Sequence, residues 1–208
     1  MILETLVVGA LAVNCYIVGC EATHEAAVID PGDEAGRIVA TLNKKGLKLK
    51  YIILTHAHFD HSGAAKELQH TTSAQVLVHE KDATLLMNTQ AQAALFGMKV
   101  NPAPKPDKFI KEGDVVKVGT IEMKVIDTPG HTQGGISLYM PAEHVVFTGD
   151  TLFWGSIGRT DLPGGDQKTI LHSLKQKLGR LPDHTKVYSG HGDETEIGFE
   201  KRENPFFE

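Results

Sequence analysis

Three histidines and one aspartate stand within six positions of this chain, directly after an apolar run. The segment Leu54–Gly63 reads LTHAHFDHSG and follows the apolar residues Tyr51, Ile52 and Ile53. So many ionisable groups at the end of a buried strand lower stability unless a partner compensates their desolvation. Alternate strand side chains point to one side, so His56 and His58 project together, with Cα atoms roughly 6.5–7 Å apart. The pattern therefore predicts a metal site at a strand end.

The chain must then turn at Phe59–His61 to enter a helix, for which Ser62 is the candidate N-cap. This turn can aim Asp60 and His61 at a second point close to the first. The spacing differs from the His-Glu-x-x-His motif on a helix, which is another zinc-binding solution.

Three later segments repeat the form of an apolar strand followed by a loop with one ligand-type residue. The three residues, each directly preceded by a glycine, are His131, Asp150 and His191. Glycine permits tight turns and close backbone approach, which helps several strand ends to converge. One histidine after a glycine is more often an ordinary loop residue, but four such strand ends in one chain indicate a shared metal site.

Many short strands with few helices between them suggest sheet packed on sheet, with helices outside. The predicted strands are 2–8, 15–20, 26–29, 51–54, 75–79, 114–118, 121–127, 135–140, 144–149 and 186–190, and the predicted helices are 33–46, 62–69, 81–97 and 166–180. The residues after 190 are expected to form a short polar tail. Alternating prolines at 102, 104 and 106 favour an extended connector. We therefore expect one domain, residues 1–208, whose two halves meet near residues 99–110.

The composition limits the partners and the compartment. A net charge of −5 without a long basic block argues against a nucleic-acid partner. No apolar stretch approaches membrane-spanning length, and the N-terminus lacks the positive region of a signal peptide. Cys15 and Cys20 are too few for a disulfide framework, form a poor zinc pair and are expected to be buried. These features favour a cytoplasmic protein with no membrane or nucleic-acid partner.

The HAHFDH segment, with His131, Asp150 and His191, resembles the ligand set of the metallo-β-lactamase superfamily, and the resemblance covers nearly the whole chain. It implies an α/β (α+β) fold, the four-layer αββα sandwich. It also implies two divalent metal ions, with zinc the first choice and iron or manganese as alternatives. By this resemblance the first ion is held by His56, His58 and His131, the second by Asp60, His61 and His191, and Asp150 bridges them.

A ligand set with aspartate at the bridging position is similar to that of glyoxalase II, the hydroxyacylglutathione hydrolases. True β-lactamases of the superfamily usually have cysteine at this position. Antibiotic hydrolysis is therefore not expected. Short glyoxalase II-like bacterial proteins also resemble this chain in FTGDTLFWGSIGRTDLPGGD and in the final NPFF. Glyoxalase II itself has an additional C-terminal helical region that helps to bind glutathione, and only 17 residues follow His191 here.

The expected activity is cleavage of a small-molecule thioester, similar to S-lactoylglutathione, by a metal-bridging hydroxide that Asp60 helps to orient. Arg159 and Asp161, in the glycine-rich segment after Asp150, either orient a polar substrate or stiffen their loop. One alternative is a non-haem iron persulfide dioxygenase, which the GRTD stretch also resembles, with His56, His131 and Asp150 as the iron ligands. Another is a lactone hydrolase that uses the same two ions.

Further residues have candidate supporting roles. Acceptors for the ligand histidines are sought among Thr55, Thr128 and Asp30, which lie near strand ends. Phe153 and Trp154 are expected in a pocket wall or the core, and Phe206 and Phe207 are expected to pack the tail onto the body. Surface or structural roles are expected for His24, His70, His79, His144, His172 and His184.

Overall fold

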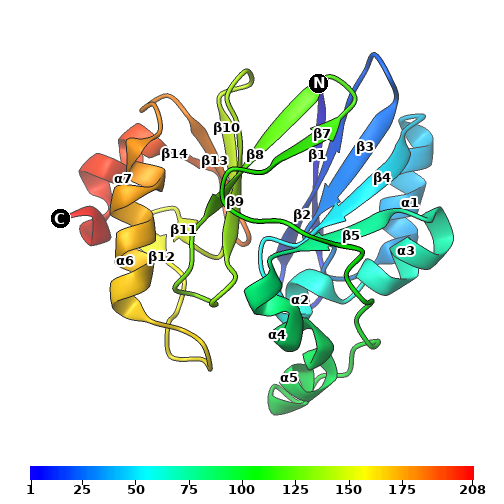
Figure 1. Cartoon of the computed structure of the whole chain (residues 1–208), viewed down its shortest axis with the longest axis horizontal. Coiled ribbons are helices and arrows are strands. Elements are labelled where there is room, and N and C mark those ends of the chain that lie inside the picture. Colours follow the sequence, from blue (N-terminus) through cyan, green and yellow to red (C-terminus); the bar gives the residue numbers. More distant parts are fainter.

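Two six-stranded sheets pack face to face, and helices cover their outer faces (Figure 1). The computed structural model describes all 208 residues. The first sheet contains, in spatial order, β1 (Ile2–Val8), β2 (Val13–Gly19), β3 (Glu25–Ile29), β4 (Lys48–Ile53), β5 (Gln75–Val78) and β6 (Lys108–Phe109). The second contains β14 (Thr195–Glu196), β13 (Lys186–Ser189), β10 (Val145–Gly149), β9 (Ile136–Met140), β8 (Ile121–Asp127) and β7 (Val115–Val118). A short hairpin pairs β11 (Leu152–Phe153) with β12 (Ser156–Ile157).

Three apolar cores separate the four layers. In β2, Cys15 and Ile17 face the core under the helices of the first sheet, whereas Tyr16 and Val18 face the core between the sheets. This two-residue alternation with both faces buried explains why the central strands are continuous apolar runs. A third core, under the helices of the second sheet, includes Leu174. The expected αββα sandwich is confirmed.

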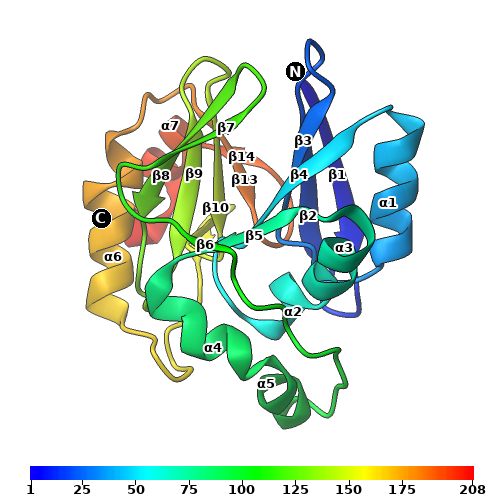
Figure 2. The same ribbon diagram turned by 45° about the vertical axis from the view of Figure 1, so that its right-hand side comes forward.

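The outer helices follow strands of the same sheet. The helices α1 (Ala35–Lys44) and α3 (Ala65–Thr72) lie beside the first sheet, after β3 and β4 (Figure 2). The strands β3, β4, β5 and β6 are parallel, so their carboxyl ends share one edge. On the other side, α6 (Gln167–Gln176) joins β10 and β13 through the β11–β12 hairpin, and these two strands are also parallel. Ligand-type residues that follow these strands therefore gather at one end of the sandwich.

The chain passes from the first sheet to the second between Phe109 and Val115. Residues 98–107, which contain the alternating prolines, form neither helix nor strand. This places the change of sheet close to the expected meeting point of the two halves, and the single-domain assignment stays a prediction. No helix has the length and apolarity needed to cross a membrane.

The predicted helix start at Ser62 is wrong. The chain already coils from Phe59 to Ser62 as α2, and α3 follows with Ala64 as its N-cap. The Ser62 hydroxyl donates to the carbonyl oxygen of His58 at 2.9 Å, so it is engaged within α2 and does not cap the next helix. The expected helix over 81–97 is broken at Asn88 into α4 (Ala83–Met87) and α5 (Thr89–Leu95), after a 3-10 turn, η1 (Glu80–Asp82).

The expected polar tail is also wrong, because the residues after His191 contain β14, α7 (Ile197–Glu203) and the 3-10 turn η3 (Pro205–Phe207). The carboxylate of Glu200 is fully buried and accepts hydrogen bonds from Gly155 N, Thr195 Oγ1 and Asn204 Nδ2. These bonds fasten α7 to the β11–β12 hairpin. Phe206 and Phe207 pack against the third core, as predicted.

Candidate metal centre

The seven candidate ligands lie together at one end of the sandwich, although they come from four segments of the chain. His56 and His58 follow β4, Asp60 and His61 belong to α2, His131 lies between β8 and β9, Asp150 follows β10, and His191 follows β13. Convergence of the strand ends, which the sequence pattern predicted, is therefore observed.

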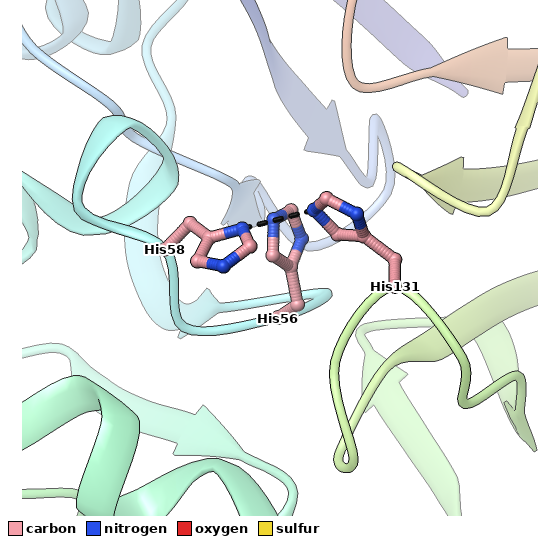
Figure 3. A group of neighbouring side chains, drawn as sticks. All are labelled: His56, His58 and His131. Carbon is pink, nitrogen blue, oxygen red and sulfur yellow. Dashed lines mark hydrogen bonds between the residues drawn. The ribbon is translucent and has the colours of Figure 1, made fainter. Parts of the chain in front are cut away.

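The first group of donors consists of His56, His58 and His131. One nitrogen from each ring lies within 4.8 Å of the others, and all three side chains are buried. The rings point toward one another (Figure 3), with His131 Nε2 only 2.9 Å from His58 Nδ1. Three imidazoles that converge in this way offer three nitrogen donors to one cation.

The second group consists of Asp60, His61 and His191, whose donor atoms also lie within 4.8 Å of one another. The Nε2 atoms of His61 and His191 are 3.3 Å apart. Asp60 Oδ2 lies 3.7 Å from His61 Nε2 and 3.5 Å from His191 Nε2. This group offers two imidazoles and one carboxylate.

Asp150 lies between the two groups. Its Oδ1 is 3.4 Å from His61 Nε2 in the second group, and its Oδ2 is 3.5 Å from His131 Nε2 in the first. The same Oδ2 is 3.6 Å from His191 Nε2. A carboxylate with one oxygen toward each group has the position that a bridging ligand requires.

Three of the imidazoles use Nδ1 for a hydrogen bond and keep Nε2 for the centre. His131 Nδ1 is 2.8 Å from the carbonyl oxygen of Arg159, and His191 Nδ1 is 3.0 Å from that of Leu11. His61 Nδ1 is 3.1 Å from Oδ2 of Asp30. An N–H that donates to a carbonyl or carboxylate fixes both the tautomer and the ring orientation of a metal ligand.

Asp30 also supports His56 through Thr55. The hydroxyl of Thr55 donates to Asp30 Oδ2 at 2.6 Å, which leaves its oxygen to accept from His56 Nδ1 at 3.1 Å. Asp30 and Thr55 therefore have the supporting roles expected of them. Thr128, the third candidate, has a core role, because its hydroxyl bonds to the hydroxyls of Ser137 and Thr151.

Two buried polar atoms of the centre have no hydrogen-bond partner: Nε2 of His56 and Oδ1 of Asp150. A buried acceptor without a hydrogen-bond partner destabilises the folded protein. The other contacts of the two residues orient these atoms toward the groups of donors. A cation would satisfy both. The set of imidazoles and carboxylates fits zinc, iron or manganese.

The electrostatics of the centre leave some imidazoles neutral and others protonated when no ion is bound. Burial lowers the pKa of His56 well below its usual value, and burial with the neighbouring imidazoles lowers the pKa of His58 to about 3. Burial acts in the same direction on His61, but the carboxylates of Asp150, Asp60 and Asp30 outweigh it and raise that pKa to about 10. Burial opposes ionisation of Asp60, yet the neighbouring imidazoles hold its pKa below the usual range.

The glycines before two of the ligands allow contacts that no side chain would permit. A Cβ on Gly190 would lie 2.2 Å from Asp150 Oδ1 and 2.8 Å from His61 Cε1. Gly149 has a φ of +50°, and a Cβ there would lie 2.2 Å from Thr55 Oγ1. The backbone therefore passes directly against the donor groups at the ends of β10 and β13.

Sequence reasoning missed Asp82, which joins the loops that carry the first group of donors. Its Oδ2 accepts from Ala57 N at 3.0 Å and from Thr132 Oγ1 at 2.8 Å, and its Oδ1 accepts from Gly134 N at 2.7 Å. Asp82 is 1% exposed. A single aspartate at the start of a helical segment carries no pattern that would have revealed this role.

Two residues of β2 hold the His191 loop and were also missed. Asn14 Nδ2 donates to the carbonyl oxygens of Ser189 and Gly192 at 3.1 and 2.8 Å. The Tyr16 hydroxyl donates to the carbonyl oxygen of Ser189 at 2.6 Å. The first sheet therefore positions a ligand that the second sheet carries.

A cavity of about 340 Å³ opens beside the donors. Arg159 lines it, and its Nε and Nη2 donate to the two carboxylate oxygens of Asp161, each at 2.7 Å. Asp161 is not part of the lining, so Arg159 is the member of this pair that borders the cavity. Trp154 is 58% exposed and faces Phe199, so its expected place in the core or in the wall of this cavity is wrong. The Phe153 ring lies 6.3 Å from that of His191.

The remaining histidines have no part in the centre. His79 is buried and accepts from Lys81 N, and the five exposed ones are His24, His70, His144, His172 and His184. Both cysteines are free and buried, as expected.

Similarity to known proteins agrees with this geometry. "Hydroxyacylglutathione hydrolase GloC" of Haemophilus influenzae is 40% identical over 208 residues, which cover 99% of this chain and 98% of the relative. The crystal structure of "BLEG-1 B3 metallo-beta-lactamase" superposes with a TM-score of 0.92 at 37% identity over 99% of both chains. TTHA1623 in a di-iron-bound form gives 0.90 at 38% identity, over 98% of this chain and 99% of that one. ETHE1 from Myxococcus xanthus gives 0.83 at 33% identity, over 99% and 84%.

The sequence profile of the Metallo-beta-lactamase superfamily matches residues 8–191, a range that contains all seven candidate ligands. With the αββα layers and the two groups of donors, this match assigns the family. The chain belongs to the metallo-β-lactamase superfamily.

Proposed function

We propose that this chain is a metal-dependent hydrolase that cleaves a small-molecule thioester of the S-lactoylglutathione type. The observation that carries the proposal is the position of Asp150, with one oxygen toward each group of donors. Such a centre suits two ions, with zinc the first choice and iron or manganese as alternatives. The 40% identity to a relative named hydroxyacylglutathione hydrolase supports this substrate class, and the di-iron form of TTHA1623 supports iron.

Two divalent ions, when bound, supply an activated water and polarise a carbonyl oxygen, so the protein needs no serine or cysteine nucleophile. His56, His58 and His131 would hold one ion, Asp60, His61 and His191 the other, and Asp150 both. Asp60 also lines the cavity, where its carboxylate can orient the water. The leaving thiolate needs no full protonation, which favours a thioester over an amide.

Arg159 is the proposed substrate contact, because it lines the cavity. The bidentate pair with Asp161 would hold the guanidinium in place while its other N–H groups remain for a polar part of the substrate. A cytoplasmic location, without a membrane or nucleic-acid partner, completes the proposal.

A second candidate is a non-haem iron persulfide dioxygenase, which the similarity to ETHE1 supports. In that case His56, His131 and Asp150 would form the triad of two histidines and one carboxylate around one iron. The second group of donors would then need no ion.

Measurement of metals per chain, with parallel assays of S-lactoylglutathione cleavage and of oxygen uptake with glutathione persulfide, separates the two candidates. We expect two ions and thioester cleavage. One iron per chain with oxygen consumption and no cleavage would overturn the proposal. A β-lactam belongs in the same assay because of the similarity to BLEG-1, and we expect no hydrolysis of it.

A further inference from the structure

The walls of the cavity beside the donors are largely apolar. Separate segments build these walls: the loop before β2, the helices α2, α4 and α5, and the loop between β12 and α6. Their apolar side chains are Leu11, Phe59, Leu85, Leu95, Phe96, Leu162 and Pro163. Two of them, Leu95 and Phe96, are 83% and 48% exposed, so α5 presents apolar surface to solvent at the rim.

The polar residue of the α5 wall has no N–H left for a ligand. Both amide hydrogens of Gln92 are used, because its Nε2 donates to the carbonyl oxygens of Leu85 and Ala57 at 2.6 and 3.3 Å. Its Oε1 accepts from Phe59 N at 3.2 Å. Gln92 therefore connects the segments of this wall through hydrogen bonds. The surface that the wall offers to a ligand is apolar.

The charges in the lining do not complement a glutathione moiety, which carries two carboxylates and an ammonium group. Arg159 is the single cation of the lining, and its charge is paired with Asp161. Asp60 and Asp150, the other charged side chains of the lining, would be ligands of the proposed ions and so offer no partner to a charged group of the substrate. A highly charged group therefore gains little inside the cavity and is better placed in solvent.

We infer that this cavity binds an apolar acyl group of several carbons, an inference that rests on the proposed thioester hydrolase function. The thiol carriers of thioesters bear amides or charges, so the acyl group is the part that apolar walls can bind. A volume of about 340 Å³ is at the lower end of the range for small-molecule sites, which fits a chain of a few methylenes. The carrier would extend through the opening toward solvent.

Phe96 is the specificity-determining side chain in this arrangement. It lines the cavity and remains 48% exposed, so truncation removes a wall without removing a core residue. Its ring lies 5.6 Å from the ring of Phe59, which forms the adjoining wall. Phe109 on β6 is a matched control, since it is also 48% exposed and is absent from the lining.

The test uses the metal-loaded protein and a series of N-acetylcysteamine thioesters, from acetyl to octanoyl, that share one neutral thiol. Each added methylene should raise kcat/KM about fourfold until the cavity is full, the factor that corresponds to about 0.8 kcal/mol per buried CH₂. Phe96→Ala should lower kcat/KM roughly tenfold for the octanoyl substrate and much less for the acetyl substrate. Phe109→Ala should match the parent protein across the series.

Calorimetric titration with octanamide gives a readout that does not depend on turnover. We expect binding with a negative heat-capacity change, the sign of apolar burial, and weaker binding by Phe96→Ala alone. If kcat/KM for thioester cleavage depended neither on acyl length nor on the Phe96→Ala substitution, the inference would be overturned and the proposed function would remain intact. Octanamide binding that depends on Phe96, with no thioester cleaved, would overturn the function and leave the apolar binding site.

Discussion

The carboxylate of Asp30 lies 3.1 Å, through its Oδ2, from the Nδ1 atom of His61, and both side chains are almost fully buried. The same oxygen accepts the Thr55 hydroxyl, which in turn contacts His56. One acid at the end of β3 therefore orients a donor in each of the two groups.

Asp30→Asn should weaken metal binding more than it weakens the fold. The carboxylate accepts from Thr55 N through Oδ1 and contacts Thr55 Oγ1 and His61 Nδ1 through Oδ2, whereas the amide keeps only one oxygen acceptor, so these three bonds cannot all survive. Loss of such a supporting contact costs about 10- to 100-fold in metal affinity or activity. Competition with a chromophoric chelator measures the affinity, and Asp33→Asn, on the exposed loop that follows, serves as the control. Unchanged affinity in Asp30→Asn would contradict the orienting role.

Asp150→Ala should lose both metal content and activity, because its two oxygens face both groups of donors. Elemental analysis after purification, with the S-lactoylglutathione assay, checks this. The exposed His24→Ala serves as the control and should retain both. Full turnover by Asp150→Ala would remove the bridging role.

Asp82→Ala should destabilise the protein by roughly 2–4 kcal/mol, because it leaves Ala57 N, Gly134 N and the Thr132 hydroxyl without their buried acceptor. It should also weaken binding of the first ion, since Ala57 lies between two of its ligands. Urea unfolding and metal titration measure the two effects separately. Asp183→Asn, on the surface, should change stability by less than about 0.5 kcal/mol. Normal stability in Asp82→Ala would mean that the two loops hold together without it.

Metal uptake at pH 8 should release protons. In the metal-free protein three carboxylates raise the pKa of His61 to about 10, so this imidazole is protonated at pH 8 and an ion must displace the proton. Apparent metal affinity should therefore rise with pH toward 10. The stability that the protonated pair gives the metal-free protein is present below the unfolded value near 6.5 and is lost as pH rises through 10. Calorimetry in two buffers of different ionisation enthalpy counts the protons, and equal heats in both would contradict the prediction.

Gly190→Ala should remove activity while the protein still folds. The new methyl group would lie 2.2 Å from Asp150 Oδ1, so the bridging carboxylate or the His191 loop has to move. Gly36→Ala is the matched control, because its Cβ would meet nothing within 4 Å inside α1, and it should stabilise the protein slightly. Circular dichroism, metal content and activity together distinguish a displaced ligand from an unfolded chain.

The sequence was informative where many ligand-type residues stand close together and where strands are buried on both faces. Five imidazoles and two carboxylates at strand ends form a pattern that few other sites share, and β2 and β3 are apolar on both faces, so their positions were readable. Ser62 misled because a hydroxyl before a helix can also bond within the preceding turn. The helix α7 was missed because hydrogen bonds to buried Glu200 hold it, rather than a broad apolar face.

The roles of Asp82 and Asn14 could not be predicted from the sequence for a different reason. Each is a single polar residue whose partners lie far away in the chain, such as Gly134 for Asp82 and Gly192 for Asn14. Local spacing carries no information about such contacts, which exist only once the two sheets have packed together.

Four of the candidate ligands precede the proline-rich connector and three follow it, so neither half of the chain holds a complete set of donors. The metal centre therefore forms only when the two halves of the chain come together. If the chain is divided within 98–107, where no helix or strand is interrupted, we expect the two fragments to complement each other. Recovery of activity would then report whether two molecules fused to those fragments bind each other.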